Sequence, residues 1–508
     1  MLIKEFNIVK KNWREVDLKF ALCYPSVYRV GMTCLAVHLL YELLNMRRNV
    51  LCERVFFEPY FNMRSVESNR VLSDFDVVGF SLQYEVDYVN FVRMLLSSNI
   101  PVYSRDRDDS HPIVIAGGPA VSSNPEPVAP LVDAIVIGEL EPIIDDILNI
   151  FIDSEDRESC LDELMSVRGV YVPRNIYPVK RSWIKSLDDA HHAVAQIIPQ
   201  VRSSSRFSPI FGRAFLLEVT RGCKWACKFC LEGFNYRPFR ERSLHVIEEI
   251  LDEGLRRTGV DKIVIIGSDA SDHSELEDVC EYIVSSGLKI SIPSMRAKVV
   301  DEKIIKLLVK GGQRTLTLAP ETGSESLRHY IGKFLSNQDV IDAAKIAYSC
   351  GIRNIKLYFI VGLPNETEDD IKSIFDLARR VADVGFSFPR SVRLTVSIFI
   401  PKAHTPFQWY GLEDPSILRS RIKLLRRLCA GDRRIELRVM RLREAVIQAF
   451  LSRAGREAAS LIVDAAKFGG SLSAWRRAEK IAKISIEREA TSVKSLEDYL
   501  PWGHIEVA

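Results

Sequence analysis

The chain has 508 residues, of which 47% are apolar and 27% are charged, and its formal net charge is only +2. This composition is typical of a folded protein with several domains, and it excludes a mostly disordered chain and a uniformly basic nucleic-acid binder. The ten cysteines are too few for a disulfide scaffold, no apolar run reaches the roughly 20 residues of a membrane span, and the first residues lack a signal-peptide pattern. We therefore expect a cytoplasmic protein.

Residues 1–151 alternate short apolar runs with amphipathic ones. Strands are predicted at 19–24, 54–57, 76–82, 112–116 and 134–137, and helices near 33–46, 84–98 and 140–151. This alternation predicts an α/β domain with a doubly wound, Rossmann-like sheet, whose strands are mostly parallel and whose two faces are covered by helices.

Sheets of this kind bind ligands beyond the carboxyl ends of their strands. The residues that fall there are Tyr24, Ser81, Gln83, Gly117, Gly118, Gly138 and Glu139. The glycines allow a ligand to approach the backbone closely, and loops that are nearly free of charge suit a broad, mostly apolar ligand. Neither a G-x-G-x-x-G nor a G-x-x-x-x-G-K-S/T motif follows these strands, which disfavours a dinucleotide or a nucleoside triphosphate.

Residues 152–213 lose this periodicity, apart from one strand predicted at 169–173, and are interpreted as a connector between two domains. The adjacent His191 and His192 in this segment are expected to be exposed. Three N-terminal cysteines, Cys23, Cys34 and Cys52, are expected to be small buried side chains.

The stretch from Glu218 to Cys230 contains Cys223, Cys227 and Cys230 within eight residues, directly after an apolar run that predicts a strand. Three thiolates leave a tetrahedral zinc site one ligand short, whereas a cubane 4Fe-4S cluster can keep its fourth iron open to another molecule. A zinc site completed by a distant residue, or three unrelated loop cysteines, are the alternatives.

The spacing C-x-x-x-C-x-aromatic-C, with Phe229 as the aromatic residue, resembles the signature of the radical SAM superfamily. The resemblance implies a 4Fe-4S cluster on the three cysteines, with S-adenosylmethionine bound to the open iron. It also implies an electron donor of the flavodoxin or ferredoxin type and reductive cleavage of S-adenosylmethionine to a 5′-deoxyadenosyl radical.

Residues 214–410 repeat the strand–helix pattern, with strands predicted at 214–220, 261–267, 288–293, 314–319, 353–361 and 391–400. This pattern is similar to the partial (β/α)6 barrel of the superfamily, whose chemistry lies on the loops at the carboxyl ends of the strands. The resemblance implies cofactor-binding roles for Phe229, Gly267, Asp269, Ser294, Arg296, Glu321, Leu363 and Pro364. The turn Gly267-Ser-Asp269 departs from the Gly-Gly-Glu of many members.

The Gly-Gly-Pro that begins at Gly117 and the Gly-Glu-Leu-Glu that begins at Gly138 resemble the cobalamin-binding-like domain that precedes many radical SAM barrels. This resemblance implies cobalamin at the carboxyl ends of the N-terminal strands. The D-x-H-x-x-G motif that supplies an axial histidine elsewhere is absent, because Asp189-Ala-His191 has no glycine three places on. The alternative is a domain that only packs on the barrel or helps to hold substrate.

Residues 411–508 are predicted to form a helical, basic region without strands, with 19 Lys and Arg against 11 Asp and Glu from Pro415 onward. A basic helical surface is a candidate RNA-binding site. A solvated helix face that closes the barrel is the alternative.

The leading hypothesis is a radical SAM enzyme that uses cobalamin to alkylate or rearrange a carbon centre of an unknown substrate. An RNA-modifying, methylthiotransferase-like enzyme is the second hypothesis, favoured by the basic C-terminal region and the three N-terminal cysteines. A non-catalytic iron–sulfur protein is the third. No catalytic acid–base pair is predicted, because in this chemistry the cofactor carries the difficult step.

Overall fold

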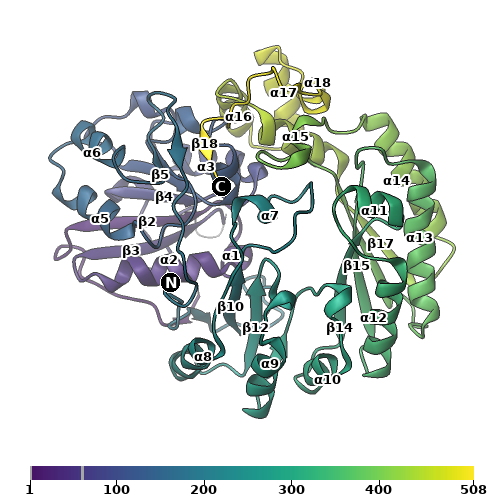
Figure 1. Ribbon diagram of the computed structural model, residues 1–508. Coiled ribbons are helices and arrows are strands. Elements are labelled where there is room, and N and C mark those ends of the chain that lie inside the picture. Colours follow the sequence, from purple (N-terminus) through teal and green to yellow (C-terminus); the bar gives the residue numbers. More distant parts are fainter. Residues whose placement is uncertain (1–2, 59–61, 508) are drawn as a thin grey trace.

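The computed structural model describes residues 3–58 and 62–507, which form an N-terminal sheet, a half-open barrel and a C-terminal group of helices (Figure 1). The N-terminal sheet has the strand order β3-β2-β4-β5-β6-β7. Its strands are β2 Leu18–Tyr24, β3 Val50–Phe56, β4 Val77–Ser81, β5 Ile113–Gly117, β6 Ala134–Val136 and β7 Val170–Tyr171. The chain order reverses between β2 and β4, and at such a point doubly wound sheets bind their ligands.

Both faces of this sheet are covered by helices, namely α2 Leu35–Met46, α3 Tyr88–Ser97, α4 Pro119–Ser123, α5 Ile144–Asp153 and α6 Arg157–Leu164. Every residue of β3 and β4 is buried, as expected for parallel strands enclosed on two sides. Neighbouring strands are parallel except for β7, which runs antiparallel to β6. Both α6 and β7 lie in the predicted connector, and β7 is the last strand of the N-terminal sheet.

The rest of the connector is tied to the N-terminal sheet, the barrel and the chain ends. Strand β8 (Val179–Lys180) pairs with β18 (Ile505–Glu506), and β9 (Ile198–Pro199) pairs with β1 (Glu5–Phe6). The side chain of His192 is buried, its Nε2 accepts a hydrogen bond from the backbone N–H of Glu218 at 3.0 Å, and burial lowers its pKa to about 3. The expectation of an exposed His192 was therefore wrong, because the connector packs against the first barrel strand.

The barrel consists of two parallel sheets with the orders β11-β10-β12-β13 and β14-β15-β16-β17, with β11 as an antiparallel edge. The strands are β10 Phe215–Arg221, β11 Arg240–Glu241, β12 Lys262–Gly267, β13 Lys289–Ser291, β14 Thr315–Glu321, β15 Asn354–Val361, β16 Val392–Ile398 and β17 Ile435–Val439. The outer helices are α8 Leu244–Thr258, α9 Leu276–Ser285, α10 Glu302–Lys310, α12 Asn337–Ser349, α13 Glu368–Asp383 and α14 Pro415–Cys429. A single bridge between Met295 and Leu318 joins the two sheets.

Strand β17 was not predicted. It pairs in parallel with β16 after the crossover helix α14, so the sheet continues beyond residue 410. The segment Ile-Glu-Leu-Arg-Val has the apolar–polar alternation of a strand, but it is short and lies among arginines. The prediction of a strand-free C-terminal region was therefore wrong at this point, whereas the prediction of helices there is confirmed.

The C-terminal helices α15 Leu442–Arg453, α16 Ala458–Lys467, α17 Leu472–Ala482 and α18 Ile486–Thr491 lie between the N-terminal sheet and the barrel at the top of Figure 1. Helix α15 is buried from Ala445 to Arg453. Its Gln448 donates to the Glu85 carboxylate at 2.9 Å, and the ammonium group of Lys402 forms an ion pair with the same carboxylate. These two contacts connect Glu85 of the N-terminal domain to helix α15 and to the barrel. None of the described helices is long and apolar enough to cross a membrane.

Candidate active site

The three cysteines lie on the loop between β10 and the short helix α7 (Glu232–Asn235). The loop begins at Gly222, whose φ is +80° and whose position leaves no room for a side chain, because a Cβ would lie 2.3 Å from the carbonyl oxygen of Tyr236. Further on, the backbone N–H of Lys228 donates to the Ile331 carbonyl at 2.9 Å, and the Lys228 carbonyl accepts from Phe407 at 3.1 Å. The loop is thus held on both sides by the barrel.

In this cysteine loop Cys227 is buried, and Cys223 and Cys230 are half-buried. Burial raises the pKa of Cys223 and of Cys230 to about 11 and also raises that of Cys227, on which the cations Lys333 and Arg296 act in the opposite direction. Ligation by a metal requires the thiolate form and would supply the missing positive charge. Within the described residues, no group of three or more His, Cys, Asp or Glu side chains is arranged to hold a single metal ion. The donor set of three thiols fits a 4Fe-4S cluster with one open iron.

Two turns flank the cysteine loop. The Asp269 carboxylate, in the turn after β12, lies 3.9 Å from the Cys223 sulfur and accepts from the Ser271 hydroxyl at 2.8 Å. The guanidinium of Arg296 lies 3.6 Å from the centre of the Trp225 ring, whose indole N–H donates to Asp272. Sequence reasoning did not identify Trp225 or Asp272, because neither belongs to the cysteine spacing.

Glu321 ends β14 with a φ of +65°, a conformation that residues other than glycine rarely adopt. Its carboxylate forms an ion pair with the Lys333 ammonium at 2.7 Å, and both side chains are nearly buried. Strained backbone of this kind persists only where the surroundings hold it, and it concentrates at functional sites.

A cavity of about 250 Å³, here called the barrel cavity, opens beside Glu321. It is lined by Phe229, Ala319, Glu321, Tyr358, Phe359, Ile360, Ser397, Ile398, Phe399 and Ile400. The side chain of Leu363 is instead buried in an apolar cluster with Phe399 and Phe407, which Phe229 also contacts. Pro364 is half-buried and Ser294 is exposed, and neither lines this cavity.

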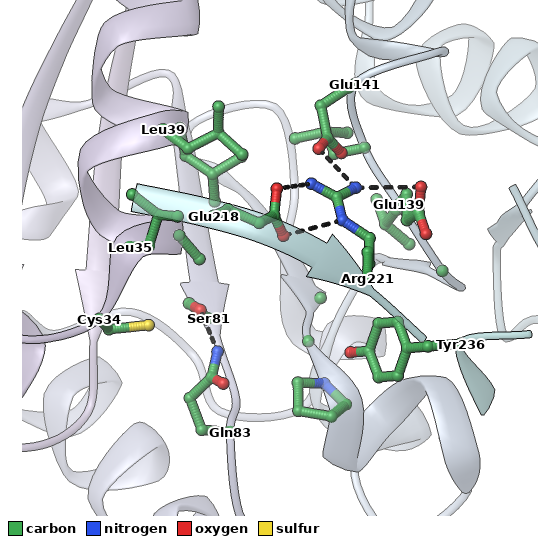
Figure 2. Close-up of a pocket in the computed structure, with 18 of the residues that line it drawn as sticks. Cys34, Leu35, Leu39, Ser81, Gln83, Glu139, Glu141, Glu218, Arg221 and Tyr236 are labelled. Carbon is green, nitrogen blue, oxygen red and sulfur yellow. Dashed lines mark hydrogen bonds and ion pairs between the residues drawn. The ribbon is translucent and has the colours of Figure 1, made fainter. Parts of the chain in front are cut away.

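A second cavity, of about 390 Å³, lies at the carboxyl edge of the N-terminal sheet and is here called the sheet-edge cavity (Figure 2). Its volume is within the range of roughly 300–1,000 Å³ of small-molecule sites. Leu35 and Leu39 of α2 give it an apolar wall, and Gln83, below them in the view, donates to the Ser81 hydroxyl at 2.9 Å. Of the residues predicted from the strand ends, Ser81, Gln83, Gly117, Gly118, Gly138 and Glu139 line it. Tyr24 does not, because its ring is buried in the core beside Phe56.

The two adjacent glycines of this cavity differ. A Cβ on Gly117 would meet only the Val136 side chain and backbone, at 3.7 Å or more. Gly118 has a φ of +109°, and a Cβ there would lie 2.6 Å from the Leu82 carbonyl oxygen. Gly118 is therefore required by the fold itself, whereas Gly117 leaves open space for a ligand.

One wall of the sheet-edge cavity is ionic, contrary to the expectation of nearly uncharged loops. Arg221, at the end of β10, contacts the carboxylates of Glu139, Glu141 and Glu218 at 2.8–3.0 Å (Figure 2). Glu139 also accepts from Arg240 and from the backbone N–H of Ile184, and these contacts hold its pKa below the usual value despite burial. This network was not predicted from the sequence, because the barrel supplies the cations and the N-terminal domain supplies two of the carboxylates.

The sheet-edge cavity and the cysteine loop share one turn. Gly267 and Ser268 line the cavity, and the next residue, Asp269, reaches the Cys223 sulfur. Gly267 is packed so closely that a Cβ would lie 2.2 Å from the Thr220 hydroxyl. Ligands in the cavity and on the cysteine loop would therefore be neighbours.

Comparison with known proteins agrees with this architecture. The model of the radical SAM superfamily matches residues 217–378, and that of radical SAM proteins, N-terminal, matches residues 36–173. An uncharacterised protein of Methanocaldococcus jannaschii is 30% identical over 395 residues, which cover 76% of this chain and 78% of the relative. The chain belongs to the radical SAM superfamily and is a radical SAM enzyme with an additional N-terminal domain.

An uncharacterised methyltransferase of Pyrococcus horikoshii is 25% identical over 314 residues, which cover 61% of this chain and 65% of the relative. Among solved structures, the radical S-adenosylmethionine methyltransferase TsrM from Kitasatospora setae, with cobalamin and a 4Fe-4S cluster bound, matches with a TM-score of 0.56 at 12% identity. The match covers 92% of this chain and 98% of TsrM. The predicted α/β fold, with an N-terminal parallel sheet, a radical SAM sheet and C-terminal helices, is confirmed.

Proposed function

We propose that this enzyme binds cobalamin in the sheet-edge cavity and transfers an alkyl group, most simply a methyl group, to a carbon of its substrate. The observation that carries the proposal is the turn Gly267–Asp269, which borders the cavity on one side and the cysteine loop on the other. The likeness of the whole fold to TsrM supports the same conclusion.

The lining of the sheet-edge cavity suits a corrin ring. The wall from α2 is apolar, and Gly117 has no side chain that would occupy the cavity. The ionic groups around Arg221 are already paired with one another. No histidine is found among the described residues that line the cavity. Cobalamin in this site would be bound without an imidazole from the protein.

The cofactors supply the bond-making chemistry, since a reduced cluster delivers an electron to S-adenosylmethionine and cobalamin carries alkyl groups. The protein holds and separates them. Cys223, Cys227 and Cys230 would ligate the cluster, while Glu321 and Arg296 would contact the amino and carboxylate ends of S-adenosylmethionine. The apolar walls of both cavities would exclude water from the reacting groups. An external electron donor of the flavodoxin or ferredoxin type would reduce the cluster.

The proposal is tested with protein reconstituted anaerobically with iron, sulfide and excess hydroxocobalamin. Gel filtration should leave about one cobalamin and about four irons per chain. After reduction with titanium citrate, S-adenosylmethionine should be consumed slowly even without substrate. Loss of all cobalamin on gel filtration from protein with an intact cluster would remove alkyl transfer from the proposal and leave the radical SAM assignment standing.

The methylthiotransferase-like alternative receives no support from the N-terminal cysteines. Cys23 and Cys52 are fully buried within β2 and β3, whereas Cys34 precedes α2 and lines the sheet-edge cavity. Burial raises the pKa of each of these thiols. Cys23 and Cys52 behave as small apolar side chains, and the three thiols do not share one loop as ligands of a second cluster.

The proposed RNA contact is weakened by internal pairing of the basic residues. Arg421 is held by Glu366 and Glu413, and Arg434 by Asp383 and Asp432. Acidic side chains of the same protein thus neutralise part of the positive charge of residues 411–508. This favours a structural role for the region over RNA binding.

A further inference from the structure

The two faces of the sheet β14–β17 carry different side chains. In β15, Ile355, Leu357, Phe359 and Val361 are buried in the main core, whose other members include residues of α12 and α13. Because successive side chains of a strand point to opposite faces, Lys356, Tyr358 and Ile360 point the other way. In Figure 1, α12, α13 and α14 lie on the outer side of this sheet, and its other face is turned toward the centre of the molecule.

This inner face is strongly polar near the amino ends of its strands. The parallel register places Lys356 beside Arg393 and Arg393 beside Glu436, and one step further it places Tyr358 beside Thr395 and Thr395 beside Arg438. We call these six residues the inner wall. Tyr358 also lines the barrel cavity, so the wall continues directly into that cavity.

The inner wall has three cations and one carboxylate. The carboxylate oxygens of Glu436 accept from Arg393 Nε at 2.8 Å and from Arg438 Nε at 2.9 Å, and these contacts lower its pKa. The Lys356 ammonium donates to the neutral Tyr358 hydroxyl at 2.7 Å. The inner wall therefore carries two positive charges that no carboxylate within it neutralises.

These cations remain within reach of a ligand. The side chain of Arg393 is 40% exposed and that of Arg438 is 60% exposed, although both stand on the inner face of a barrel. Guanidinium groups that are open on one side bind carboxylates or phosphates through two parallel hydrogen bonds.

We infer that the substrate of this enzyme carries an anionic group, a carboxylate or a phosphate, that is bound by Lys356, Arg393 and Arg438 on the inner wall. The inference rests on the proposed function, since the molecule that it describes is the acceptor of the alkyl group. From Lys356 to Ile360 the strand rises about 13 Å at about 3.3 Å per residue. The reacting carbon therefore lies on the order of 10 Å from the anionic group, with the less polar part of the molecule toward the barrel cavity.

The test is equilibrium dialysis of the cobalamin- and cluster-loaded protein against isotope-labelled pyrophosphate and, separately, labelled succinate. The wild type should bind at least one of them, and the stronger probe identifies the group as phosphate or carboxylate. Lys356→Met and Arg438→Gln should each weaken that binding about tenfold. Arg476→Gln, on the exposed face of α17, removes the same charge and should leave it unchanged.

Failure to bind either probe, or equal weakening in Arg476→Gln, would overturn the inference. Iron content, cobalamin content and slow consumption of S-adenosylmethionine are measured on the same preparations, and Arg476→Gln should match the wild type in all three. If the wild type lacks these properties, the proposed function fails, whatever the probes show. If they are present without anion binding, only the inference fails.

Discussion

The carboxyl edges of the N-terminal sheet and of the barrel lie next to each other, yet they present different chemistry. The edge of the N-terminal sheet is mostly apolar, is shaped by glycines and uses its carboxylates in ion pairs with the barrel. The edge of the barrel presents three thiols, a strained Glu321 and the Arg296 guanidinium. Parallel topology determines where ligands bind in both sheets, whereas the loop residues determine which ligand each edge accepts.

The largest expected effect is loss of the iron–sulfur cluster at the barrel edge without loss of cobalamin at the edge of the N-terminal sheet. Cys223→Ala, Cys227→Ala and Cys230→Ala should each reduce the iron content from about four per chain to nearly none, because the cubane loses one of only three protein ligands. Cobalamin retention should persist, since the sheet-edge cavity does not contain these side chains. Iron and cobalamin are measured by elemental analysis and absorption spectroscopy.

Cys280→Ala is the matched control, because Cys280 is fully buried on α9 and lies outside the loop. Its iron content should equal that of the wild type. A count near eight irons that falls with Cys23, Cys34 or Cys52 would instead support the methylthiotransferase-like reading.

The second effect concerns the two glycines of the sheet-edge cavity. Gly117→Leu should weaken cobalamin binding at least tenfold with little change in stability, because the new side chain would extend into the cavity. Gly118→Ala should instead lower the free energy of unfolding by about 1–3 kcal/mol or more, since its Cβ would clash with Leu82 and its φ is unfavourable. Cobalamin titration and chemical denaturation distinguish the two outcomes. Equal cobalamin binding by Gly117→Leu and the wild type would place the corrin elsewhere.

A smaller effect is expected at the barrel edge. Glu321→Gln removes the ion pair with Lys333 and one charged group of the barrel cavity, so S-adenosylmethionine should bind about tenfold more weakly. Iron content should not change, because Glu321 is not a cluster ligand. Glu368→Gln, at an exposed position of α13, is the control for loss of a carboxylate. Unchanged affinity in Glu321→Gln, measured by calorimetry on the reconstituted protein, would contradict the assigned role.

The last effect is a pH dependence of stability to which buried histidines of both domains contribute. Burial lowers the pKa of His38 and His404 to about 4 and that of His192 to about 3, below the value of about 6.5 of an unfolded chain. Below pH ~6.5 the unfolded chain binds protons that the folded chain does not, so the stability present above this pH falls as the pH approaches 4. Each histidine contributes up to about 1.4 kcal/mol per pH unit.

Denaturation between pH 7 and pH 5 measures this slope. His192→Gln keeps an acceptor for the Glu218 N–H and should make the slope shallower. His245→Gln, at an exposed position of α8, should have the slope of the wild type. Identical slopes in all three proteins would mean that His192 is not the source.

Much of the fold is determined by local patterns. The predicted barrel strands agree with β10 and with β12 to β16 within a few residues, because continuous or alternating apolar residues between helices mark each of these strands. The cysteine spacing, together with the strand before it and the order of the later loops, predicted the superfamily.

Only the tertiary structure decided the properties that depend on distant partners. Tertiary packing buries the ring of Tyr24 in the core and pairs Arg221 with carboxylates of another domain. It also explains why the backbone requires glycine at position 118 but not at position 117. It also added β17, which aligns Arg393, Glu436 and Arg438 on one face. Periodicity along a chain shows which face of an element is apolar. The charged groups that contact a given side chain come from elements far away in the sequence, and only packing brings these elements together.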